Sequence, residues 1–179
     1  MFNKRIILLS SFLILSFISG QKNNNDISGV SITNKYNNSN FLGANYISGW
    51  NTGSFWMGIY CYNVESIAGF QFNLPEDLQL INVKGLRAKN KNFNIPINKE
   101  KGMFLGFSYG GDTIEPSLTK LKDKNMLVKL HLKVLNNEKR VFNIKSILAS
   151  SKGERLLFET EPQQIKINND ETITIRFIE

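Results

Sequence analysis

The chain has 179 residues, of which 41% are hydrophobic and 21% charged, and its formal net charge is +7. This composition excludes a disordered chain, and the length accommodates one ordinary domain with extensions. The single cysteine excludes an internal disulfide framework and a multi-cysteine metal cluster, and the single histidine excludes a histidine-rich metal site.

The first twenty residues have the features of a signal peptide. Lys4 and Arg5 precede a largely apolar run over residues 6–17, and small residues lie just before Gln21. The run is short for a membrane span, which needs about 20 apolar residues, so a retained anchor is the less favoured alternative. We expect cleavage near Gly20–Gln21, localisation outside the cell or at its surface, and no stable membrane insertion afterwards.

Residues 21–53 are rich in Asn, Ser and Gly. Such a segment buries little apolar surface, so we expect a leader that is flexible or partly covers the following domain. Short strands at residues 30–33 and 41–47 are possible additions. A single domain is expected over residues 54–179.

From Ser54 onward, apolar and polar residues alternate with a period of two, which is typical of β-strands. Turn-forming residues separate these runs, and no run shows an apolar stripe at helical spacing. We expect an all-β, antiparallel β-sandwich. The expected strands cover residues 54–62, 70–74, 78–83, 103–107, 126–134, 141–148, 156–158, 164–167 and 172–178.

One side of the strand at residues 54–62 carries three large aromatic residues, Trp56, Tyr60 and Tyr62. Flat aromatic rings on a sheet can stack on sugars or anchor a protein interface, so these three are the candidate ligand-binding residues. The alternative is that both faces of this strand are covered, with Tyr46 and Trp50 of the leader as the cover. Cys61 belongs to the other side of the strand and is expected to be a buried apolar residue.

The sequence contains no recognisable catalytic motif. His131 lies between Lys129 and Lys133 on the polar side of a strand, where neighbouring cations oppose a role as general base. The acidic residues lie in turns and loops. Asp112 and Glu115 could supply oxygen ligands to calcium, but they do not form a complete ligand loop, so no cofactor is expected.

Basic residues gather at Lys84, Arg87, Lys89 and Lys91, and again in residues 120–124. On an exported protein, we interpret these clusters as solvated loop charge or as an attraction to acidic polysaccharide or envelope. Phe93 is the one aromatic residue near the first cluster, which is too little for base stacking, so no nucleic-acid partner is expected.

Residues 67–74, IAGFQFNL, resemble the opening strand of cohesin-like modules. The resemblance continues in MFLGFSYGGDTI at residues 103–114, in MLVKLHLKV at residues 126–134, and in the late strands around Gly153. It covers about residues 51–167 in the family's order. Residues 117–124 depart from the pattern as an insertion.

The resemblance implies a nine-stranded jelly-roll sandwich, related to a carbohydrate-binding fold and found in secreted bacterial proteins. The best-known members bind dockerin modules through one sheet face and so assemble polysaccharide-degrading enzymes. We therefore expect a monomeric, non-catalytic binding module whose partner is an extracellular, dockerin-like protein. The alternatives are a carbohydrate-binding module for polysaccharide, a structural cell-envelope or adhesive component, and a glycoside-active enzyme.

Overall fold

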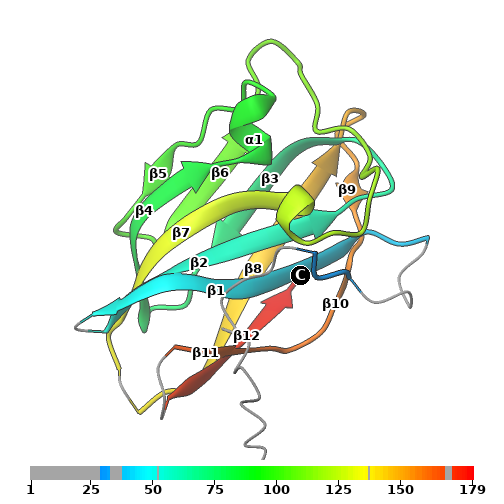
Figure 1. Cartoon of the computed structure of the whole chain (residues 1–179). Helices are drawn as coiled ribbons and strands as arrows, with labels where there is room; N and C mark the ends of the chain where they lie inside the picture. Colours follow the sequence, from blue (N-terminus) through cyan, green and yellow to red (C-terminus); the bar gives the residue numbers. More distant parts are fainter. Residues whose placement is uncertain (1–28, 33–37, 52, 137, 168–170) are drawn as a thin grey trace, which may run out of the picture.

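The strands of this chain form two sheets that pack face to face, as the computed structural model shows (Figure 1). The structure describes residues 29–32, 38–51, 53–136, 138–167 and 171–179, so the expected signal peptide lies outside the described residues. The all-β sandwich with jelly-roll topology predicted from the sequence is confirmed. Most neighbouring strands are antiparallel, whereas the β1–β10 and β8–β12 pairs are parallel.

The sheet nearer the viewer in Figure 1, here called the front sheet, has five strands. In spatial order they are β10 (Glu159–Thr160), β1 (Phe41–Asn51), β2 (Ser54–Tyr62), β7 (Met126–Val134) and β4 (Leu78–Gly85). A short helix, α1 (Arg87–Asn90), follows β4, and a 3₁₀ turn at Asp123–Asn125 leads into β7.

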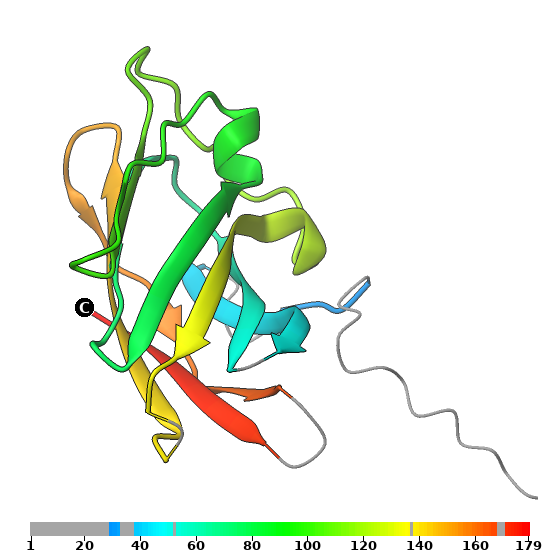
Figure 2. The ribbon, with the colours of Figure 1, turned by 90° about the vertical axis from the view of Figure 1, so that its left-hand side faces the viewer.

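The back sheet has seven strands. In spatial order they are β11 (Gln163–Lys166), β12 (Thr172–Ile178), β8 (Val141–Ser150), β3 (Ile67–Asn73), β6 (Met103–Phe107) and β5 (Ile97–Asn98), with β9 (Arg155–Leu156) paired to β8. Figure 2 shows the two layers from the side.

The core lies between the sheets and contains the inward half of each alternating strand. Strand β8 shows the rule plainly, because Phe142, Ile144, Ser146 and Leu148 are fully buried while Asn143, Lys145 and Ile147 face outward. Phe72 is also fully buried, and its ring centroid lies 5.1 Å from that of Phe104. Burial of these inward apolar residues is the main stabilising contribution to the sandwich.

The sandwich begins at Phe41, within the segment that the sequence analysis placed in the leader. Strand β1 pairs with β2 from Phe41–Tyr62 to Asn51–Ser54, with two bulges on the way. Its alternation is hidden in the sequence because the outward positions include Gly43 and Asn45, which carry little pattern. The inward residues Leu42 and Ala44 are nonetheless buried in the core.

Replacing Phe72 with alanine should lower the free energy of unfolding by about 3–5 kcal/mol, because it opens a cavity among packed rings. Gln71→Ala, one residue earlier and on the outward side, is the control and should cost less than about 1 kcal/mol. Urea unfolding followed by tryptophan fluorescence measures both. Equal losses for the two variants would contradict the assigned inward and outward sides.

Candidate functional site

The three candidate aromatic residues share the outer side of β2 but differ in accessibility. Trp56 and Tyr62 are half-buried, whereas Tyr60 is only 1% exposed. The structure therefore brings them onto one face, as alternation predicted, without making a continuous exposed aromatic strip. The predicted role of these three side chains in ligand binding remains a prediction.

Tyr60 is buried because its ring lies flat across Gly43 of the neighbouring strand. A side chain at Gly43 would overlap the tyrosine ring. Phe41 stacks beside this ring, with centroids 6.2 Å apart, and Ile32 and Met126 complete a small apolar cluster. Tyr60 is thus a packing residue of the outer face.

The segment Val30–Ile32 helps to cover this end of the front sheet. The Ile32 amide donates to the carbonyl of Lys120 at 2.8 Å, and the Lys122 amide donates to the carbonyl of Val30 at 2.9 Å. Tyr46, a suggested cover, instead points inward and stacks on Phe55 at 6.4 Å. The Trp50 side chain lies outside what the structure describes.

Charged groups surround the buried Tyr60 hydroxyl. Burial raises the pKa of Tyr60 well above its usual value, and the negative charge of Glu161 raises it further. The hydroxyl hydrogen-bonds Gln163 Oε1 at 3.3 Å, and Lys122 Nζ lies 5.0 Å from the ring centroid. Burial lowers the pKa of Lys122, an effect that Glu161 opposes. These contacts hold Tyr60 in place as a neutral phenol.

Trp56, at the other end of β2, has a different environment. Its indole stacks on His131, with ring centroids 4.8 Å apart and planes within 10°, and Lys84 Nζ lies 4.8 Å from the indole centroid. The Trp56–His131 pair follows from the β2–β7 register. Trp56 also lines a hollow, together with Lys84, Lys89 and Lys129. Of the three candidates, it is therefore the one whose half-exposed ring lies in a hollow beside charged groups.

Arg87 anchors the long connection between β6 and β7. Its Nη1 donates to Asn63 Oδ1 at 2.9 Å and to the Cys61 carbonyl at 3.0 Å, and its Nη2 donates to the Glu115 carbonyl at 2.6 Å. The fully buried Asn63 donates in turn to the carbonyls of Glu65 and Glu115 at 2.7 and 3.0 Å. Partial burial lowers the pKa of Arg87.

The interpretation of Arg87 as solvated loop charge is therefore wrong for this residue, although Lys84, Lys89 and Lys91 are exposed. Its acceptors come from distant parts of the chain, so local charge patterning could not reveal them.

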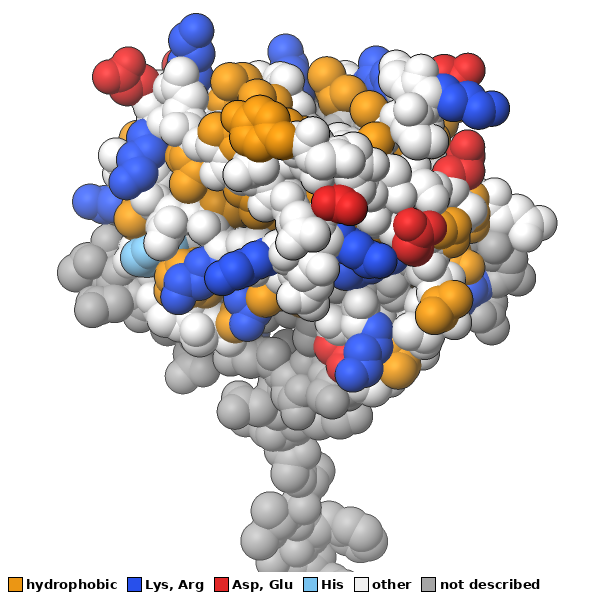
Figure 3. Space-filling view, turned by 90° about the horizontal axis from the view of Figure 1, so that it is seen from above, with side chains coloured by type: hydrophobic (Ala, Val, Ile, Leu, Met, Phe, Trp, Pro, Cys, Tyr) orange, Lys and Arg blue, Asp and Glu red, His pale blue; other side chains and the backbone are white. Residues whose placement is uncertain are grey.

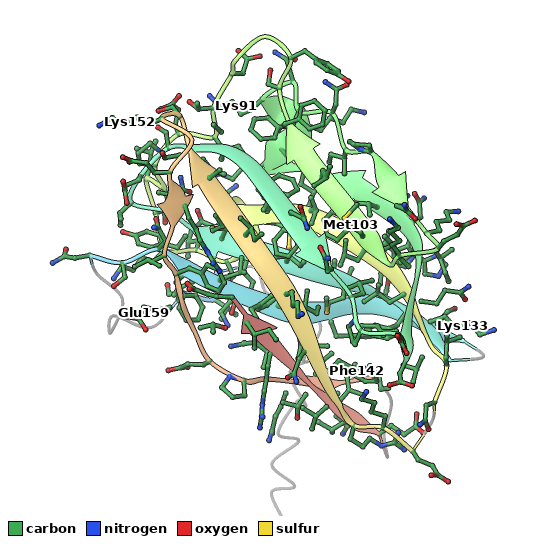
Figure 4. The ribbon with its side chains drawn as sticks, turned by 180° about the vertical axis from the view of Figure 1, so that it is seen from behind. Lys91, Met103, Lys133, Phe142, Lys152 and Glu159 are labelled. Carbon is green, nitrogen blue, oxygen red and sulfur yellow. The ribbon has the colours of Figure 1, made fainter. Side chains whose placement is uncertain are left out.

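The outer side of the back sheet carries an apolar surface that the candidate residues did not include. We call it the β8–β3–β6 face. Figure 4 looks onto it, with Met103 of β6 labelled. Its outward residues are Gly69, Gln71 and Asn73 of β3, Met103, Leu105 and Phe107 of β6, and Lys145, Ile147 and Ala149 of β8.

A shallow hollow lies at the centre of the β8–β3–β6 face. Gly69 has no side chain to fill it, and Leu105, Phe107, Ile147 and Ala149 form its apolar lining. Ile147 is 42% exposed. Most antiparallel sheets with a solvated face carry polar residues there, so the apolar centre distinguishes this face from an ordinary solvated one.

The residues considered for metal binding and catalysis stand in other contacts. Asp112 Oδ2 accepts from Ser108 Oγ at 3.0 Å, and Glu115 Oε1 accepts from Thr113 Oγ1 at 3.0 Å. Within the described residues, no group of three or more His, Cys, Asp or Glu side chains is placed to hold a metal ion. No helix in the described part of the chain is long and apolar enough to cross a membrane.

Comparisons with known proteins give likenesses at the level of the fold. No family model and no curated protein matches the chain. Among solved structures, a non-cellulosomal cohesin from the archaeon Archaeoglobus fulgidus has a TM-score of 0.47 and 11% identity, covering 79% of this chain and 92% of that chain.

Two further structures are cohesins in complexes. The third ScaB cohesin of R. flavefaciens, in complex with a group 1 dockerin, has a TM-score of 0.49 and 15% identity over 73% of this chain and 94% of that chain. The sixth cohesin of scaffoldin B from Acetivibrio cellulolyticus, in complex with a Cel5 dockerin, has a TM-score of 0.47 and 11% identity over 78% of this chain and 99% of that chain. These solved structures are cohesins, the family that the sequence resembles.

Removing the Arg87 guanidinium should destabilise the protein. Arg87→Met keeps the apolar stem but removes the charged donor shared by the Asn63 amide oxygen and the carbonyls of Cys61 and Glu115, so we expect a loss of about 2–3 kcal/mol in the free energy of unfolding. Lys91→Met, at an exposed position on the same segment, is the control and should change it by less than about 0.5 kcal/mol. Chemical denaturation measures both, and a neutral Arg87→Met would show that the cluster is not an anchor.

The Cys61 thiol should be inert in the folded protein. Cys61 is fully buried, and burial raises its pKa to about 12, an effect that Arg87 only partly opposes. A thiol-specific disulfide reagent at pH 8 should therefore label it only when denaturant unfolds the chain. Rapid labelling without denaturant would contradict this.

The same pKa predicts a pH dependence. The unfolded thiol loses its proton above about pH 8.5, whereas the folded thiol keeps it up to about pH 12. The contribution of Cys61 to stability is therefore complete below pH 8.5 and declines above it. Urea unfolding of wild type and Cys61→Val at pH 7.5 and pH 10 should show the larger decline for wild type.

Proposed function

We propose that this chain is an exported, non-catalytic binding module that recognises another extracellular protein, of dockerin type, through the β8–β3–β6 face. The observation that carries the proposal is the apolar centre of that face, where Leu105 and Phe107 of β6 and Ile147 of β8 point outward on either side of β3. Export is supported by the signal-peptide features of residues 1–20.

The chemistry of the β8–β3–β6 face suits contact rather than catalysis. Its central residues offer apolar surface, and Gln71 and Asn73 add amide groups that already hydrogen-bond each other, Nε2 to Oδ1, at 2.8 Å. Lys145 is the one ionisable group among its outward residues, and it does not line the hollow. An apolar centre with polar groups around it is the usual anatomy of a protein interface.

The shape of this face also suits a protein partner. The flat centre at Gly69 is bordered by Phe107, whose ring meets that of Tyr109 edge to face at 4.9 Å. Tyr109 is 83% exposed and extends the apolar surface beyond the end of β6. Such aromatic and aliphatic anchors around a hollow contribute most of the binding energy in protein complexes.

The dockerin-type partner rests on the sequence resemblance to cohesin-like modules, carried by residues 67–74, 103–114 and 126–134. Two of these stretches form β3 and β6, the strands that provide the centre of the β8–β3–β6 face. The resemblance and the apolar surface therefore involve the same part of the chain.

Charge placed at the centre of this face should abolish partner binding. We would immobilise the protein and measure binding to a panel of purified dockerin modules and to secreted and envelope fractions of the source organism, with and without calcium. Any specific partner of the wild type should bind Ile147→Asp at least tenfold more weakly, because a carboxylate would be desolvated in the interface.

Two controls make this experiment decisive. Lys166→Gln, at an exposed position on the edge strand β11, should leave binding unchanged, and an unaltered unfolding curve shows that Ile147→Asp is folded. A protein partner that binds Ile147→Asp as tightly as wild type would overturn the assignment of this face. The absence of any protein partner would overturn the proposed function itself.

A further inference from the structure

We propose that the hollow around Trp56, on the outer side of the front sheet, is a separate binding site for acidic polysaccharide. This hollow, here called the basic hollow, is lined by Trp56, Lys84, Lys89 and Lys129 together with Ile47 and Ser48 of β1. It lies on the opposite layer from the β8–β3–β6 face, so the inference does not rest on the proposed function.

The charge of the basic hollow is of one sign. Every charged residue that lines it is a lysine, and the three lysines come from β4, from α1 and from β7. Figure 3 shows basic side chains gathered beside the single, pale blue histidine. Side chains of like charge that converge from three elements favour an anionic ligand.

Trp56 provides a flat apolar surface in this basic setting. His131 stacks on the indole at 4.8 Å and so fixes its orientation. On the β1 side, Gly49 has no side chain to place against the indole, and a Cβ there would lie in ordinary contact, 3.6 Å from Trp56 Cδ1. An oriented, half-exposed indole suits the apolar C–H face of a sugar ring.

The two features together select the ligand class. A neutral sugar would use the indole and leave the lysines without a role, and a polyanion without rings would use only the lysines. A sugar that carries an acidic group satisfies both, since its ring can lie on Trp56 while its carboxylate or sulfate meets Lys84 or Lys129. Lysine binds either acid as a point charge, so the shared chemistry is an anionic sugar.

A polymer fits better than a single sugar because lysines continue along the outer side of the front sheet beyond the basic hollow, although the Tyr60 ring itself is buried. Lys122 Nζ lies 5.0 Å from the Tyr60 centroid and Lys120 Nζ lies 5.7 Å from that of Tyr62. From Trp56 to Tyr62 the strand extends about 20 Å. Positive charge therefore continues along the outer face beyond the basic hollow.

Affinity electrophoresis tests this assignment with named probes. The full chain should be retarded in gels containing polygalacturonate and not in gels containing neutral dextran. Trp56→Ala should weaken binding about fivefold or more, and the double variant Lys84→Gln, Lys129→Gln should also weaken it and reduce its dependence on salt. Retardation by dextran sulfate with the same Trp56 dependence would support the site and identify sulfate as an accepted acid.

Matched variants separate this site from general charge and from the other face. Tyr109→Ala removes an exposed ring, and Lys145→Gln with Lys152→Gln removes two exposed charges, all away from the basic hollow. Both should bind polygalacturonate like wild type. Ile147→Asp should keep its affinity for the polymer, whereas loss of protein binding in that variant bears only on the β8–β3–β6 face.

Three results would overturn the inference. Trp56→Ala could bind polygalacturonate as tightly as wild type, which would exclude stacking. Polyglutamate could bind with the same affinity and the same Trp56 dependence, which would favour an acidic protein segment as occupant. The wild type could show no retardation at low salt. In the double lysine variant, Lys84 is exposed and Lys129 is half-buried on the outer side of β7, so neither change disturbs the core and the variant keeps the test valid even if Trp56→Ala is destabilised.

Discussion

Each long strand of this chain must bury one of its two sides in the core that the sheets share, and this constraint determines what the outer faces are free to do. Phe72, Phe104 and Phe142 fill the interior from the back sheet, and none of them is measurably exposed. With the inward positions occupied, outward residues such as Leu105 and Ile147 contribute little to the core. Their apolar character is therefore a property of the surface, where it opposes solubility unless a partner covers it.

The front sheet meets the same constraint differently, because part of its outer side has a small core of its own. Gly43 and Gly58 leave space that Tyr60 and Met126 fill by lying flat on the sheet. Ile32 covers them, and it is held by backbone hydrogen bonds to the segment around Lys120. Closure of this end leaves the Trp56 end as the accessible aromatic part of the face.

Arg87 links these two features. It fixes the connection between β6 and β7 at the Glu115 carbonyl, and the same connection carries the residues that pair with Val30 and Ile32. A guanidinium suits this role because its planar donors reach several fixed acceptors at once, which a lysine cannot do. The cover over Tyr60 thus depends on contacts between parts of the chain about 90 residues apart.

These dependencies explain what the sequence could and could not predict. The bounds of Met126–Val134 and Thr172–Ile178 are predicted to the residue, because a period of two is read locally. A bulge at the start of β7 nevertheless places Met126 on the outer side and Leu127 in the core. The outward side of Trp56, Tyr60 and Tyr62 is predicted by the same period of two. The burial of Tyr60 is not, since it depends on a glycine of the neighbouring strand and on the pairing of two distant segments.

The sequence of β6 contains a signal of the β8–β3–β6 face that an alternating apolar and polar pattern does not explain. Residues 103–107 read MFLGF, with no polar residue on either side of the strand. Such a run is typical of a strand covered on both faces. In the structure one side meets the core, while nothing in the described chain fills the hollow on the other side. The sequence of β6 is thus apolar on both sides, although the described chain covers only one of them. This is the pattern expected of a strand whose second side is covered by a partner.

The two surfaces lie on opposite layers with the phenylalanine core between them, and this separation has a functional consequence. Close-packed sheets deform little, so occupation of one outer face does not require a rearrangement of the other. Binding at the two faces is then expected to be nearly independent in free energy, as for distant sites in general. Simultaneous binding would still raise the local concentration of a partner protein beside the polymer, because attachment to a common module makes the second contact intramolecular. Under the two proposals made above, a rigid sandwich with two unlike faces would link a protein to an acidic polymer without any conformational signal between them.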